Sequence, residues 1–61
     1  MTKTEASQLA QDMLRQHGQA EFEVSLGNAE DYAVVGAAFV ALGCRTEPNG
    51  EFFVLKVFPA G

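Results

Sequence analysis

The candidate pair for nucleophilic chemistry in this chain is its one cysteine, Cys44, and its one histidine, His17. A cysteine nucleophile needs a base within reach, and the imidazole of His17 is the base that the sequence offers. His17 is expected to end a helix, where an imidazolium interacts favourably with the helix dipole, and no second histidine is present for a metal site. We therefore predict a protein that is not an enzyme, with no catalytic residues, no bound metal and no cofactor.

Carboxylates are the other chemically active side chains, because the chain has eight acidic and four basic residues and a net charge of −4. Six of the acids, but only one of the bases, fall within residues 18–55. A negative surface repels nucleic acid and anionic lipid and speeds encounter with basic protein surfaces. We therefore expect a protein partner with a basic surface, and neither direct nucleic-acid binding nor membrane binding. The acids predicted to contact this partner are Glu21, Glu23, Glu30, Asp31, Glu47 and Glu51.

These acids also have a structural interpretation, which stays open beside the functional one. Glu30 and Asp31 are predicted in the first turn of a helix, where the helix dipole stabilises negative charge. Glu21 and Glu23 alternate with apolar residues and so belong to the solvent side of a predicted strand. All six acids together would also keep a small protein soluble.

The 61 residues allow one domain, which we expect to span residues 1–61, and 48% of them are hydrophobic, enough for a small core. The single Cys44 cannot form an internal disulfide, which fits a reducing compartment. The first residues, MTKTEASQ, contain no apolar signal core, and the longest apolar run, residues 32–42, is shorter than a bilayer requires. We therefore expect a cytoplasmic protein.

Two helices are predicted from their capping residues and apolar spacing. Thr2 and Glu5 have the spacing of a capping box, and apolar residues then recur at steps of three and four until Gly18, which predicts a helix over 3–17. Asn28 starts a second predicted helix over 29–42, which Gly43 should end.

The second predicted helix has two apolar sides. The side with large residues is expected to cover a sheet: Tyr32, Val35, Phe39 and Leu42. The other side permits close approach of a neighbouring backbone, and we expect the first helix there ahead of a second copy of the chain. This alanine side consists of Ala33, Ala37 and Ala41, flanked by Val34 and Val40.

Alternating residues predict a strand over 20–26, and Pro48-Asn49-Gly50 predicts a tight reversal between strands over 44–47 and 51–58. The last strand is apolar on both faces, which is typical of a central strand, and a right-handed crossover gives the strand order 1-3-2. We thus predict an α+β fold with element order α-β-α-β-β, in which two helices pack on one face of a three-stranded antiparallel sheet. The expected core is Phe22, Val24, Phe39, Phe53 and Leu55. The expected apolar contacts on the other, open face are Phe52, Val54 and Phe58.

The chain resembles the small acidic single-domain anti-CRISPR proteins of phages and mobile elements in its size, its helix-and-sheet layout, its lack of a catalytic constellation and its acids. These acids are Glu21, Glu23, Glu30, Asp31, Glu47 and Glu51. The resemblance covers the full chain as a type and involves no shared motif. It implies an inhibitor that acts in a host bacterial cell and binds a CRISPR effector complex at the basic surface that receives target DNA. The preferred target is a type I surveillance complex, with the acids acting as a DNA mimic.

Two further interpretations are kept. Cys44-Arg45-Thr46-Glu47-Pro48 is similar to a stretch of the small sulfur-carrier proteins, but it lacks their Cys-Pro pair, and Cys44 follows a predicted helix instead of beginning one. The other interpretation is a small regulatory or accessory interaction domain that forms a homodimer through its apolar open face or its alanine side. The predicted oligomeric state is therefore monomer or homodimer.

Overall fold

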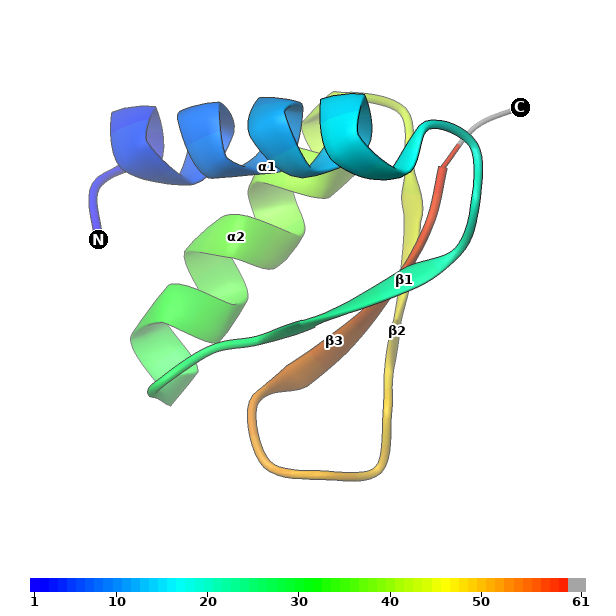
Figure 1. Cartoon of the computed structure of the whole chain (residues 1–61). Helices are drawn as coiled ribbons and strands as arrows, with labels where there is room; N and C mark the ends of the chain where they lie inside the picture. Colours follow the sequence, from blue (N-terminus) through cyan, green and yellow to red (C-terminus); the bar gives the residue numbers. More distant parts are fainter. Residues whose placement is uncertain (60–61) are drawn as a thin grey trace.

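Two helices and three strands follow one another along residues 1–59, the part of the chain that this computed structural model describes (Figure 1). The predicted α+β fold and the element order α-β-α-β-β are confirmed. The elements are α1 (Lys3–His17), β1 (Phe22–Ser25), α2 (Ala29–Ala41), β2 (Arg45–Pro48) and β3 (Val54–Phe58).

The sheet has the predicted order β1-β3-β2, and both neighbouring pairs are antiparallel. The central strand β3 pairs Leu55 with Val24 of β1 and with Pro48 of β2. Every residue of β3 is at least half-buried, whereas the edge strands each expose residues to solvent. The apolar character of β3 on both faces therefore accounts for its central place.

Both helices start at the predicted caps. In the capping box of α1, the Thr2 hydroxyl accepts the Glu5 N–H at 3.1 Å, and the Glu5 carboxylate accepts the Thr2 N–H at 2.8 Å. The Asn28 side chain accepts the Asp31 N–H at 2.8 Å at the start of α2. These bonds satisfy backbone donors that a helix cannot pair internally, so local sequence alone fixes where α1 and α2 begin.

The hydrophobic core lies between the helices and one face of the sheet. Four of the five predicted core residues are buried: Phe22, Val24, Phe39 and Leu55. Phe39 is fully buried, and its ring meets that of Phe22 edge to face at 5.7 Å between centroids. The core also contains Val35, which was expected to cover the sheet, and four residues outside the expected core, namely Ala6, Ala10, Cys44 and Val57.

The prediction of a tight reversal after Pro48 and of a strand from residue 51 is wrong. A longer loop, residues 49–53, joins β2 to β3, and two of its residues have left-handed backbone: Gly50 at φ 87° and Phe53 at φ 58°. A left-handed residue breaks the alternation of a strand. Phe53 is therefore half-buried in the loop and is not part of the core, and Phe52 is 91% exposed on the loop instead of on the open face.

The predicted position of α1 over the alanine side of α2 is also wrong. α2 buries Val35 and Phe39 as expected, but α1, although it contacts α2, leaves Ala33, Ala37 and Ala41 exposed. The small buried residues that permit close approach lie on α1 itself, which buries Ala6 and Ala10 completely. Leu42, expected over the sheet, is 41% exposed. Neither helix of residues 1–59 has the length and apolar character needed to cross a membrane.

Candidate interaction surface on the open face of the sheet

The face of the sheet that points away from the helices carries the alternate residues of all three strands. Phe22, Val24, Leu55 and Val57 are buried on the helix side, so their strand neighbours point the other way. We call this surface the open face. It consists of Glu21, Glu23, Ser25, Arg45, Glu47, Val54, Lys56 and Phe58.

Two of the predicted acids flank a lysine at the centre of the open face. The register places Glu23 of β1 and Glu47 of β2 directly opposite Lys56 of β3, one on each side. Neighbouring strands are about 4.8 Å apart, so the two acidic positions are about 10 Å apart across the sheet. Glu23 and Glu47 are therefore separated by a base and do not form a continuous acidic row.

Both bases of the open face are engaged by other residues of the chain. The Lys56 ammonium lies 3.7 Å from a Glu21 carboxylate oxygen and 5.4 Å from the centre of the Phe58 ring. The Arg45 guanidinium lies over the same ring at 4.7 Å. Glu23 and Glu47, by contrast, have no ion-pair partner within residues 1–59. These two carboxylates are the charges of the open face that remain available to another molecule.

The other three predicted acids lie away from this surface. Asp31 is at the start of α2, where its carboxylate accepts hydrogen bonds from the Met1 ammonium at 3.0 Å and from the Asn28 amide at 3.4 Å. The hydrogen bond and negative charge of Asp31 raise the pKa of the Met1 amino group. Glu30 is exposed in the same helical turn, and Glu51 is in the loop between β2 and β3. The open face thus brings together Glu21, Glu23 and Glu47.

The two residues considered for covalent chemistry have packing roles. Cys44 precedes β2 and is 7% exposed, so its thiol is inside the core. His17 ends α1, as predicted, and its ring stacks on Phe22 with 4.5 Å between centroids. No three side chains of the His, Cys, Asp and Glu types are grouped for metal binding within residues 1–59.

Arg45 and Lys56 belong to the open face, although sequence reasoning did not select them. Their signal was present, because Arg45 alternates with Glu47 along one strand and Lys56 alternates with Val54 and Phe58 along another. What was missing was the register that places Lys56 between Glu23 and Glu47.

Comparison with known proteins gave no match to this chain among protein-family models, curated proteins or solved structures. The open face is therefore the basis on which we infer a function.

Proposed function

We propose that this protein acts by binding and not by catalysis, and that its open face covers a basic surface of a partner protein. The observation that carries this proposal is the pair Glu23 and Glu47, two carboxylates without an ion-pair partner within residues 1–59 on an uncovered sheet. The sheet backbone fixes the positions from which these side chains extend. Two lysine or arginine side chains about 10 Å apart on the partner would match this pair.

The partner that we propose is the DNA-receiving surface of a type I CRISPR surveillance complex, so that the protein is an inhibitor of CRISPR–Cas immunity. The resemblance in size, charge and layout to small acidic anti-CRISPR proteins supports this choice. A surface that binds phosphates is rich in lysine and arginine, which is the chemistry that Glu23 and Glu47 would recognise.

The form of inhibition that we propose is occupation of the basic surface without copying a strand of phosphates. Each DNA strand presents one charge about every 3.4 Å. Glu23 and Glu47 are about three times as far apart, and Lys56 lies between them. Phe58 and Val54, half-buried beside this pair, would add apolar contact of the kind that forms interface centres.

The experiment is a binding titration of the purified surveillance complex with and without target DNA. Wild-type protein should compete with DNA, and Glu23→Lys or Glu47→Lys should each weaken binding by about 5- to 150-fold, as expected for central charge pairs. Glu30→Lys is the matched control, because it makes the same change at an exposed acid outside the open face, and it should change affinity less than about two-fold.

Each part of the proposal has its own contradicting result. The absence of binding to such complexes would exclude the anti-CRISPR function. Binding that target DNA does not disturb would exclude occupation of the DNA surface. Equal effects of Glu23→Lys and Glu30→Lys would exclude the open face as the contact.

Of the two other interpretations, sulfur transfer at Cys44 is not favoured, since the thiol lies in the core. A Cys44→Ala variant should therefore bind the partner as wild type does. Self-association has one specific observation in its favour, the exposed alanine side of α2.

A further inference from the structure

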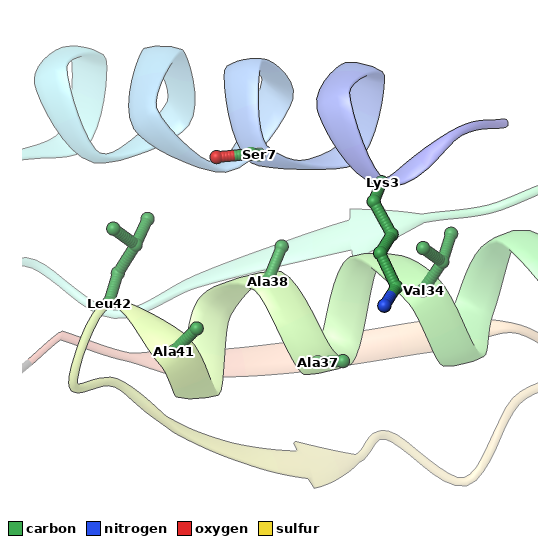
Figure 2. A pocket seen from close by; sticks show the side chains of 7 residues that line it. All are labelled: Lys3, Ser7, Val34, Ala37, Ala38, Ala41 and Leu42. Atoms are coloured by element: carbon green, nitrogen blue, oxygen red, sulfur yellow. The ribbon is translucent and has the colours of Figure 1, made fainter.

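An apolar groove lies between α1 and α2 on the side of the helices away from the sheet (Figure 2). Its volume is about 330 Å³. The residues that line it are Lys3 and Ser7 of α1, Val34, Ala37, Ala38 and Ala41 of α2, and Leu42 directly after α2. Leu42 of this lining is 41% exposed, and Val40 of α2 is 58% exposed, high values for large apolar side chains. Lys3 carries the one charge of the groove lining.

We propose that a second copy of this chain covers this groove, with the two α2 helices antiparallel about a two-fold axis near Ala37. Ala33, Ala37 and Ala41 recur every four residues and are exposed, so they form one ridge along α2. Small side chains on such a ridge allow two helix axes to approach to about 8 Å. A two-fold axis brings the same surface of both copies into contact. The alanine ridge can meet its own copy in this way because it has small side chains along its whole length.

In this arrangement the positive charge of the groove in one copy meets the negative end of α2 in the other copy. The last turn of α2 contains no basic residue, so the negative end of its dipole has no neutralising cation in that turn. Lys3 lines the groove together with Val34, which is in the second turn of α2 (Figure 2), and Lys3 has no ion-pair partner within residues 1–59. About a two-fold axis near Ala37, residue 34 of one copy lies opposite residue 40 of the other, in the last turn of that α2. In an antiparallel pair each Lys3 approaches the carboxyl end of the other α2, whereas a parallel pair would bring two Lys3 ammonium groups together.

The size of the surface sets the expected strength of the dimer. A 13-residue helix such as α2 is about 20 Å long, and a stable interface buries about 800 Å² of each partner. One helix and the edge of another provide less than this, so we expect a reversible dimer with a dissociation constant between about 1 µM and 1 mM. The open face is on the other side of the molecule, so dimerisation leaves it uncovered.

Sedimentation equilibrium of the full chain over about 10 µM to 1 mM tests the proposal. The expected result is a concentration-dependent dimer that Ala37→Glu abolishes, because it places two carboxylates at the axis. Ala20→Glu is the matched control, since Ala20 is exposed and lies outside both helices, and it should leave the dimer unchanged. Circular dichroism of both variants should show folded protein. A monomer throughout the range, or a dimer that survives Ala37→Glu, would overturn the proposal.

Cysteine cross-linking in a Cys44→Ala background tests the antiparallel orientation. Ala37→Cys should form a disulfide between two copies, because residues near a two-fold axis face their own equivalents. A mixture of Ala33→Cys and Ala41→Cys chains should cross-link to each other, and neither should cross-link with itself. Self-cross-linking of Ala33→Cys would indicate a parallel pair and contradict the proposal. None of these results depends on partner binding by the open face. A protein that does not form the dimer would therefore contradict this inference without contradicting the proposed function.

Discussion

The two faces of the sheet are formed by the same short strands, but one face is buried under the helices and the other is exposed. Along β1, Phe22 and Val24 are buried under the helices, while Glu23 between them is exposed. Along β3, Leu55 is buried and Lys56 reaches the open face between two acids. A strand alternates sides at every residue, so one strand contributes to stability on one face and to recognition on the other. Substitutions of strand residues on the helix side should therefore change the free energy of unfolding. Substitutions of strand residues on the open face should instead change the affinity for a partner.

The largest effect on stability is expected for a core aromatic. Phe39→Ala should lower the free energy of unfolding by about 3–5 kcal/mol, because Phe39 is fully buried and contacts Phe22. Stability of small domains is about 0.05–0.15 kcal/mol per residue, so this variant should be largely unfolded. Urea denaturation followed by circular dichroism measures the change.

Phe52→Ala is the matched control for Phe39→Ala, since Phe52 is 91% exposed. This variant should unfold within about 0.5 kcal/mol of wild type. Similar losses of stability in Phe39→Ala and Phe52→Ala would contradict the structure, because they would mean that the Phe52 ring is packed against the protein and not exposed.

The next largest effect on stability is expected at the N-terminal cap of α1, one of the helices that cover the sheet. Thr2→Ala removes the hydroxyl that accepts the Glu5 N–H, and it should cost about 0.5–2 kcal/mol. Thr4→Ala, which changes an exposed threonine that makes no cap, should cost less. Equal losses from the two variants would contradict the role of the capping box.

The capping box of α1 also makes the stability of the fold depend on pH. The Thr2 N–H that binds the Glu5 carboxylate lowers the pKa of Glu5 in the folded protein. Glu5 then stabilises the fold at pH values above its unfolded pKa, about 4.3, and loses this contribution as the pH falls through the lower folded value. Wild type should exceed Glu5→Gln in stability at pH 7, and the difference should vanish on acidification. A difference that grows as the pH falls would contradict this assignment.

A smaller effect is expected in the loop that contains Phe52 and Phe53, residues 49–53. Phe53 has φ 58°, a conformation that glycine adopts freely and alanine does not. Phe53→Gly should therefore be more stable than Phe53→Ala by about 1 kcal/mol, although both lose the same half-buried ring. An alanine variant as stable as the glycine variant would show that residue 53 is not left-handed in solution.

These loop residues also mark the limit of what the sequence predicts. The helix over 3–17 and the central place of β3 follow from local capping and from apolar residues on both faces. The left-handed Phe53 has no signal in its residue type, because bulky side chains rarely adopt positive φ. The grouping of Glu23 with Glu47 was equally hidden, since it depends on the register of two edge strands against β3.

The smallest effect on stability is expected on the open face. Glu23→Lys and Glu47→Lys remove no buried contact and no ion pair, but each places a second lysine opposite Lys56. Each should therefore lower the free energy of unfolding by less than about 1 kcal/mol. Urea denaturation at neutral pH checks this. A loss comparable to that of Phe39→Ala would mean that the open face supports the fold and is not free to serve recognition alone.

The most direct test of the open face as a recognition surface is the affinity of wild type and of Glu23→Lys/Glu47→Lys for a type I surveillance complex at about 50 mM and 500 mM salt. We predict that wild-type binding weakens strongly at high salt, and that the double variant binds weakly at both salt concentrations while unfolding as wild type does. Wild-type binding that neither salt nor the double charge reversal changes would contradict recognition of a basic surface by Glu23 and Glu47.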